Sequence, residues 1–256
     1  MKPMKSIYLI AAYALGSACS FGVVIVGSDF ANDAAYNGGW TNGTDGGTAA
    51  TFGAWTLTNT GVDAGRFIGS STTLASPGAD INTGGESFGM FGHTGQTSEA
   101  FRNFNGNSLG AGQTFSLDLA VNFRNGNKGF DLRNSANSVI FNFNIGSDAY
   151  VVNSALTGNG SIGNTYSDNT EFRLSFTQTD ALGGTWTITR SGGVTDVDSG
   201  TYTGVAENFK FYESQTIGGG LPENNLFFNN LTVVPEPASA ALGLIGATLL
   251  LRRRRI

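Results

Sequence analysis

The sequence predicts an all-β protein whose main body is an antiparallel β-sandwich. Three observations predict this class. Apolar and polar residues alternate over many short runs, as they do in strands with one buried face. Turn signals rich in glycine and asparagine separate these runs, and 38 of the 256 residues are glycine. Residues 23–233 show no run with the apolar spacing of an amphipathic helix. Many short strands without helices are typical of a sandwich.

The strands are expected in a regular succession along the chain. The clearest is 115–123, where large apolar residues occupy every second position. Similar alternation marks 139–145, 172–176 and 186–188. Two of these runs flank a Gly-Gly turn and predict a hairpin over 173–190. Further strands are expected at 23–26, 55–58, 67–69, 87–91, 100–104, 130–132, 150–152, 201–203, 208–212 and 226–233. Such a set indicates a sandwich domain of jelly-roll type over 23–233.

The N-terminus has the pattern of a secretory signal peptide. Two lysines precede an apolar run, which small residues follow at 16–18. We therefore expect a helical signal segment over 1–22, with cleavage within 18–22. Two alternatives stay open: an uncleaved membrane anchor, and a lipoprotein that is acylated on Cys19.

The C-terminal residues 234–256 carry three features in a fixed order. Their prolines favour an extended approach to a short uncharged run at 238–251. As a helix this run would be about 21 Å long against a hydrocarbon core of about 30 Å, so it predicts a short transmembrane helix. The terminal arginines would stop transfer and stay in the cytoplasm. The sorting motif is Val234, Pro235, Glu236 and Pro237, and the stop-transfer arginines are Arg252, Arg253, Arg254 and Arg255.

This tail resembles the PEP-CTERM sorting tail of bacterial exported proteins, and the resemblance covers the tail alone. It implies a membrane partner, processing by an exosortase-type protease-transpeptidase, and a Gram-negative bacterium that makes an exopolysaccharide or biofilm matrix. It also implies that the chain sits in the envelope membrane before processing, and on the cell surface or in the matrix afterwards. The alternative is an ordinary tail anchor of a membrane protein.

The charge distribution separates the middle of the chain from its ends. Residues 23–233 hold eight basic and 18 acidic residues, whereas the other basic residues lie near the termini. An acidic middle argues against nucleic acid as a partner. The single cysteine excludes an intramolecular disulfide, and the single histidine excludes a histidine-cluster metal site.

The middle carries no recognisable catalytic motif, so we expect no catalytic residue, no cofactor and no enzymatic activity. No sequence motif places a catalytic nucleophile near His93, so this residue is expected in a loop or at the end of a strand. Asp196 and Asp198 precede a glycine as in a calcium loop, but the further acids are missing, so a simple turn is expected there. A glycoside hydrolase, the least favoured alternative, would draw its carboxylate pair from Glu86, Glu99, Asp118, Glu171, Glu207 and Glu213.

Exposed tryptophans could stack on sugar rings. Trp186 stands in the apolar phase of its strand and is expected in the core, whereas Trp40 lies in a Gly/Asn/Thr loop and is the expected glycan contact. The middle is similar in overall pattern to concanavalin-like and carbohydrate-binding sandwiches. We expect a structural domain of the envelope or matrix, with a lectin-like module that binds extracellular polysaccharide as the alternative.

Overall fold

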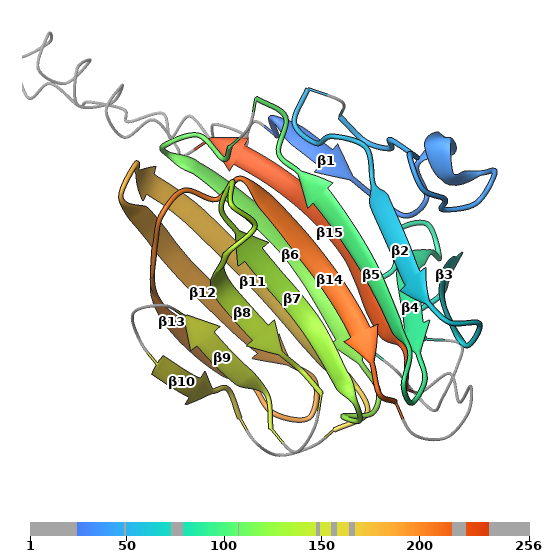
Figure 1. Cartoon of the computed structure of the whole chain (residues 1–256). Helices are drawn as coiled ribbons and strands as arrows, with labels where there is room; N and C mark the ends of the chain where they lie inside the picture. Colours follow the sequence, from blue (N-terminus) through green and yellow to red (C-terminus); the bar gives the residue numbers. More distant parts are fainter. Residues whose placement is uncertain are drawn as a thin grey trace, which may run out of the picture.

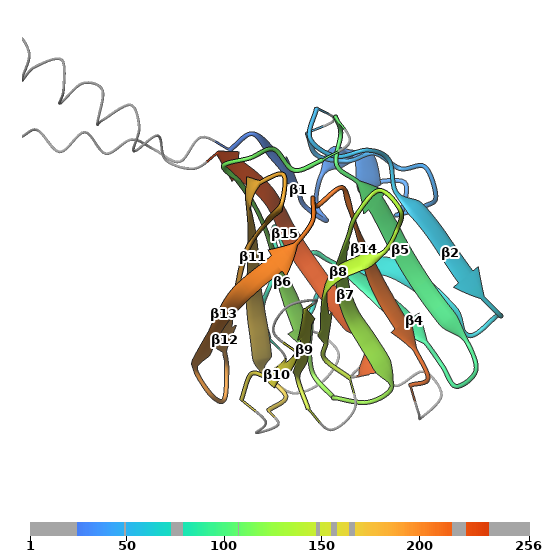
Figure 2. The ribbon, with the colours of Figure 1, turned by 60° about the vertical axis from the view of Figure 1, so that its left-hand side comes forward.

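The computed structural model describes residues 25–48, 50–72, 79–106, 108–146, 149–154, 158–163, 167–216 and 224–235. Two antiparallel sheets pack face to face and enclose the core between them (Figures 1 and 2). This arrangement confirms the predicted all-β antiparallel sandwich. The expected signal helix and transmembrane helix lie outside the described residues, and the jelly-roll or concanavalin-like type stays a prediction.

Eight strands form one sheet, in the order β13–β12–β11–β6–β15–β4–β3, with β1 paired to β15. Their bounds are β1 Gly27–Asp29, β3 Ala64–Gly69, β4 Ser87–Gly92, β6 Gln113–Val121, β11 Thr170–Asp180, β12 Gly183–Ser191, β13 Asp196–Thr203 and β15 Leu226–Pro235. Seven strands form the other sheet, in the order β10–β9–β8–β7–β14–β5–β2. Their bounds are β2 Thr56–Thr60, β5 Thr97–Asn103, β7 Asn127–Arg133, β8 Val139–Asn144, β9 Val151–Ser154, β10 Gly158–Ser161 and β14 Asn208–Ser214. One short 3₁₀ helix, η1, spans Ala34–Tyr36.

The core forms because the alternating runs turn their apolar side chains to one side of each sheet. In β11, Phe172, Leu174 and Phe176 are all buried, as the two-residue period of a strand requires. The sheets meet through aromatic rings, and Phe211 of β14 stacks on Phe228 of β15 with ring centroids 3.6 Å apart. Burial of one such ring stabilises the fold by about 1.5–3 kcal/mol.

The local predictions differ from the structure at three strands. The first described strand begins at Gly27, where pairing with β15 starts, so the described residues 25 and 26 of the strand expected at 23–26 precede it. The turn expected at Asp196 and Asp198 is wrong, since both residues belong to β13 and pair with β12. The glycine-rich β10 has no apolar alternation to signal it. The hairpin predicted over 173–190 is confirmed as β11 and β12.

The described chain begins and ends at one corner of the sandwich. β1 lies antiparallel to the end of β15, with Gly27 opposite Val233. The amide of Val26 also donates to the carbonyl of Val233 at 2.8 Å. β15 continues to Pro235, which pairs with Gln113 of β6. The sheet therefore includes the first two residues of the expected tail.

Candidate functional site

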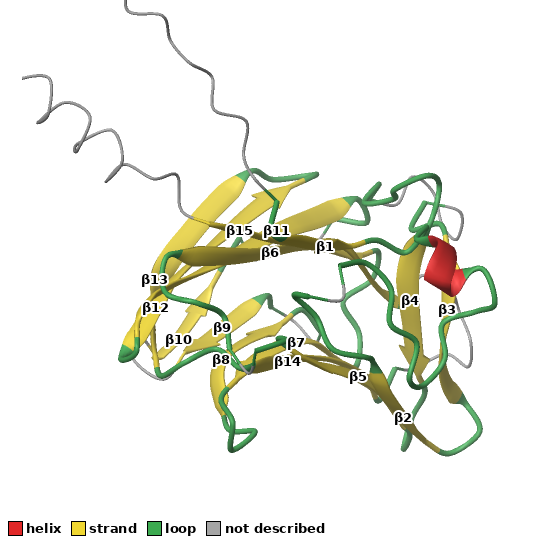
Figure 3. Ribbon diagram, turned by 90° about the horizontal axis from the view of Figure 1, so that it is seen from above, coloured by secondary structure: helices red, strands yellow, loops and turns green. Residues whose placement is uncertain are grey.

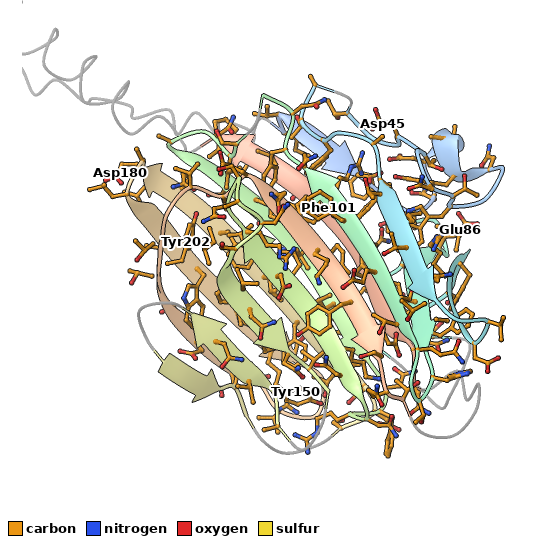
Figure 4. All side chains as sticks on the ribbon, in the orientation of Figure 1. Asp45, Glu86, Phe101, Tyr150, Asp180 and Tyr202 are labelled. Atoms are coloured by element: carbon orange, nitrogen blue, oxygen red, sulfur yellow. The ribbon has the colours of Figure 1, made fainter. Side chains whose placement is uncertain are left out.

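The outer face of the seven-stranded sheet carries a continuous polar surface. Cross-strand register decides which residues share it, because directly paired residues point to the same side of a sheet. Figure 4 labels Phe101 on β5, the strand next to the edge strand β2. We call this outer surface of the seven-stranded sheet the outer polar face. One row across six strands consists of Thr56, Phe101, Lys210, Asp131, Asn142 and Asn153, and the next contains Thr58, Glu99, Tyr212, Gly129 and Asn144.

The outer polar face is hollowed around Phe101. A depression of about 510 Å³ is lined by Phe101, Asn137 and Asn208. A second depression of about 270 Å³ shares Phe101 and Asn137 and extends to Lys210 and Thr58. Because two residues line both depressions, they form a single groove, which we call the Phe101 groove. Figure 3 shows that the seven-stranded sheet bends away from the other sheet at its β2 edge.

The charged side chains of the groove balance one another. Lys210 Nζ donates to Glu99 Oε1 at 2.7 Å and lies 3.9 Å from Asp131 Oδ2. Arg133 Nε is 3.6 Å from the same oxygen of Asp131. Burial raises the pKa of Asp131, and a hydrogen bond from Asn142 and the two nearby cations oppose this rise. Lys210 and Arg133 thus offset Glu99 and Asp131, and Glu207 adds one further acid to the groove lining, so the net charge stays small.

An amide network fixes Tyr212 beside the groove. Asn142 Nδ2 donates to the Tyr212 hydroxyl and to Asp131 Oδ1, each at 2.8 Å. Asn153 Nδ2 donates in turn to Asn142 Oδ1 at 3.0 Å. The hydroxyl lies over Gly129, where a Cβ would approach it to 2.9 Å. Burial raises the pKa of Tyr212 above its ordinary value, so the hydroxyl stays protonated.

The turn between β7 and β8 forms a wall of the groove. Asn137 has a left-handed backbone with φ of 59°, a conformation that asparagine tolerates. Asn208 Nδ2 donates to Asn137 Oδ1 at 3.2 Å and to the carbonyl of Asn134 at 3.0 Å. The Oδ1 of Asn208 is buried and has no hydrogen-bond partner among the described residues. Since an unpaired buried acceptor is costly, this oxygen is suited to receive a hydroxyl from a bound molecule.

Trp40 lies in the core, so its expected exposure to glycan is wrong. Its side chain is 4% exposed, and its ring centroid is 5.4 Å from that of Trp55, 4.9 Å from that of Phe88 and 5.5 Å from that of Phe228. The polar loop around it folds inward because burial of a large indole stabilises the fold more than its exposure does. Trp186 is 3% exposed and lies in the core, as predicted.

Asp196 and Asp198 lie in strand β13 of the described part of the chain, and His93 lies at a strand end. Asp196 and Asp198 accept hydrogen bonds from the next main-chain amides at 2.9 and 2.8 Å. In the part of the chain that the structure describes, no group of three or more His, Cys, Asp or Glu side chains could hold a metal ion. His93 follows β4 and bridges to Thr216, a strand end as predicted.

The six acids considered for hydrolysis are spread over the molecule. Only two of them line the Phe101 groove, and two others share a smaller pocket of about 130 Å³ on the eight-stranded sheet. The groove pair is Glu99 and Glu207, the pocket pair is Asp118 and Glu171, Glu213 is enclosed in the interior and Glu86 is exposed beside β4.

The sorting motif is only partly described. Val234 and Pro235 complete β15, whereas Glu236, Pro237 and the arginines Arg252, Arg253, Arg254 and Arg255 lie outside the described residues. Within the described ranges, none of the helical segments has the length and apolar character that crossing a bilayer requires.

Phe101 and Asn137 escape prediction from the sequence. Phe101 and Phe104 are three residues apart, which hides the two-residue period, and the inward position between them holds Arg102. The available signal is the exposed Thr-x-Thr pattern at Thr56 and Thr58, which marks a polar outer face. That pattern does not reveal that β2 pairs with β5.

No protein-family profile and no characterised protein matches the sequence. Similar solved structures include the binding domain of botulinum neurotoxin serotype G, with a TM-score of 0.43 and 10% identity over 86% of this chain and 49% of that one. A sialidase gives a TM-score of 0.42 and 10% identity over 70% of this chain and 16% of its own. Botulinum neurotoxin type C, whose cell entry is described as dependent on two ganglioside molecules, gives 0.39 and 14% identity over 73% and 46%. The chain spans less than half of each of these proteins.

Proposed function

We propose that the sandwich is a carbohydrate-binding module and that polysaccharide binds in the Phe101 groove. The observation that carries the proposal is a half-buried aromatic ring set among amide, hydroxyl and balanced charged side chains. The apolar face of a sugar ring packs on an aromatic ring, while its hydroxyls exchange hydrogen bonds with the polar lining. The unpaired Oδ1 of Asn208 supplies one such acceptor.

The groove favours a segment of a neutral polysaccharide over a single sugar. Its two depressions join at Phe101 and Asn137 and extend over β2, β5 and β14. The paired charges of Lys210 and Glu99 leave little net charge to select an ionic ligand.

In this proposal the groove binds its ligand without cleaving it. Glu99 is held by Lys210 at 2.7 Å, and the carboxylate of Glu207 accepts a hydrogen bond from the amide of Ser135. Both acids of the groove therefore have structural partners, which supports a binding role.

The substitution Phe101→Ala tests the groove. We expect binding to a polysaccharide panel, measured by titration calorimetry on the full chain, to weaken at least about tenfold, which is about 1.4 kcal/mol. Phe91→Ala is the matched control, because Phe91 is also partly exposed but belongs to β4 of the other sheet. Equal affinity of the Phe101→Ala variant and the wild type, or no binding by the wild type to any glycan of the panel, would contradict the proposal.

We also propose that the chain is exported to the cell envelope and that an exosortase-type enzyme processes its tail. The ordered tail motif carries this proposal, together with the signal-like N-terminus. Residue 25 and Pro235 lie at the same corner of the sandwich, so both segments are attached there.

Mass spectrometry of the mature C-terminus tests the processing step. In an exosortase-containing Gram-negative host, we expect the extracellular product to end near residues 235–237 and to lack the terminal arginines. The control is the double variant Pro235→Ala, Pro237→Ala, which should keep its tail. An extracellular product that retains residues 252–255 would contradict processing.

A further inference from the structure

A lysine and a glutamate are buried near the start of β15. The corner where the described chain begins and ends lies at the other end of this strand. Lys128 at the start of β7 and Glu213 near the end of β14 are direct cross-strand partners, and both side chains are 0% exposed. Lys128 Nζ lies 3.9 Å from Glu213 Oε1. That oxygen has no hydrogen-bond partner among the described residues, whereas Oε2 accepts the amide of Leu226 at 2.8 Å.

The enclosed amine lies against an asparagine. Lys128 Nζ donates to the main-chain carbonyl oxygen of Asn224, which stands just before β15 and is 5% exposed. This contact puts the amine beside the backbone that carries the Asn224 carboxamide. A lysine amine, a carboxyl group and a carboxamide therefore share one enclosed site, supplied by β7, β14 and the residues leading into β15.

We propose that Lys128 and Asn224 form an intramolecular isopeptide bond with Glu213 as the proton-transferring residue. The bond would join the seven-stranded sheet, through β7, to the entry of β15 in the eight-stranded sheet.

The chemistry balances without any co-reactant. The neutral Lys128 amine attacks Cγ of Asn224, and the new bond joins Nζ to Cγ. The bond from Cγ to Nδ2 breaks, and Nδ2 leaves as ammonia with a proton that Nζ loses. Glu213 takes up the proton from Nζ and supplies one to the leaving nitrogen, so it ends the reaction in the protonation state in which it began.

Burial supports the protonation states that this reaction needs. Desolvation lowers the pKa of Lys128 and raises the pKa of Glu213 to about 8. Burial thus shifts both groups toward their neutral forms, and the neutral amine is the nucleophilic form of lysine.

Such a bond would act as the covalent cross-link that this chain cannot make from cysteine. The sequence contains one cysteine, which excludes an internal disulfide. A cross-link between positions 128 and 224 closes a long loop, which stabilises the folded state by restricting the unfolded chain. It also fixes the start of the strand whose other end leads into the tail.

Peptide mapping of the full-length protein tests the bond. Trypsin cleaves after lysine only when the amine is free, so we expect residues 125–133 to stay uncut at Lys128. They should appear joined to the peptide that begins at Phe211, with a combined mass lower by one ammonia. Lys210, which is partly exposed and paired with Glu99, is the internal control and should be cleaved.

Fragment masses should place the link on Asn224. The variants Glu213→Gln and Asn224→Ala should lose the linked peptide, and Glu213→Gln keeps the size of the side chain. Because the wild-type map is decisive by itself, the test stands even if a variant fails to fold. Full cleavage after Lys128 in the wild type, a link to another residue, or an equal amount of linked peptide in Glu213→Gln would overturn the proposal.

Discussion

Single buried polar residues tie the irregular N-terminal segment to the sheets. Asp29 accepts hydrogen bonds from the Tyr36 hydroxyl at 2.9 and 2.8 Å and from Arg102. Trp55 Nε1 donates to the same hydroxyl at 2.9 Å. Arg102 also bonds to Asp45 at 2.9 Å. Because Asp29 and Arg102 are 0% exposed, removal of Arg102 would leave the Asp29 carboxylate buried without its cation, a loss of about 3–5 kcal/mol.

The substitution Asp29→Asn should flatten the pH dependence of stability. Burial raises the pKa of Asp29 from 3.8 to about 6, although Arg102 opposes the rise. Because the folded-state pKa lies above the unfolded one, the folded state binds the proton more tightly. The free energy of unfolding is then greatest below pH 3.8 and falls by up to about 3 kcal/mol as the pH rises to about 6.

Urea unfolding curves between about pH 4 and pH 7 measure this slope. Asp45→Asn is the control, because Asp45 shares Arg102 but its side chain is 37% exposed, so this variant should keep the wild-type slope. An unchanged slope in Asp29→Asn would show that this carboxylate does not titrate differently in the folded chain.

Residue-level predictions from the sequence succeed where local periodicity decides the outcome. Trp186 is buried because its position in an alternating run fixes the side of the sheet it faces. Trp40 is predicted wrongly because its loop has no period, and only the space between the sheets decides its burial. Phe101 is missed for a related reason: the ligand contact proposed for it depends on neighbours from β2 and β14 that are distant in sequence.

At the scale of elements, close backbone approach determines where glycine is required in the strands. Gly129 of β7 pairs with Asn144 of β8. A Cβ at position 129 would come within 2.0 Å of the Phe143 carbonyl oxygen and 2.9 Å of the Tyr212 hydroxyl. The glycine therefore makes room both for the β8 backbone and for the tyrosine of the outer polar face.

The substitution Gly129→Ala should destabilise the pairing of β7 with β8. A carbonyl of the neighbouring strand cannot move as a flexible side chain can, so we expect a loss of about 1–3 kcal/mol from overpacking. Thermal unfolding measures the change. Gly38→Ala is the matched control, because nothing lies within 4 Å of a Cβ at that loop position and its φ is not left-handed. Equal melting temperatures for the two variants would contradict this account.

Element boundaries follow from pairing more than from composition. β13 extends through Asp196 and Asp198, residues that favour turns, because all eight of its residues find partners on β12. β10 forms from a glycine-rich run because β9 offers it an edge to pair with. The strongly alternating β6, β11 and β12 lie close to their predicted places, since there the pattern and the pairing agree.

At the scale of the whole molecule, the two sheets are held together by a shared aromatic interior. Trp40 reaches this interior from the loop after η1 and contacts Phe88 and Phe228 of the eight-stranded sheet. It also contacts Trp55, which directly precedes β2 of the other sheet. The inner side of the seven-stranded sheet packs in the core, whereas its outer side forms the Phe101 groove. In the proposed function, stability and glycan binding therefore depend on opposite sides of this sheet.

This division predicts opposite effects for two aromatic substitutions. Trp40→Ala should lower the free energy of unfolding by about 3–5 kcal/mol, because it leaves a cavity between the sheets. It should leave the glycan affinity of the folded fraction unchanged. Phe101→Ala should weaken glycan binding and leave the free energy of unfolding within about 1 kcal/mol of wild type, since its side chain is only half-buried on the outer face.

Denaturant unfolding and titration calorimetry on the same protein samples measure the two effects. Trp40→Phe is the matched control, because it keeps a six-membered aromatic ring in the core, and the indole nitrogen it removes has no hydrogen-bond partner among the described residues. It should recover most of the stability that Trp40→Ala loses, since most of the ring contacts remain. If Trp40→Ala instead weakened glycan binding while the protein stayed as stable as wild type, the ligand site would have to be placed at Trp40 and not in the Phe101 groove.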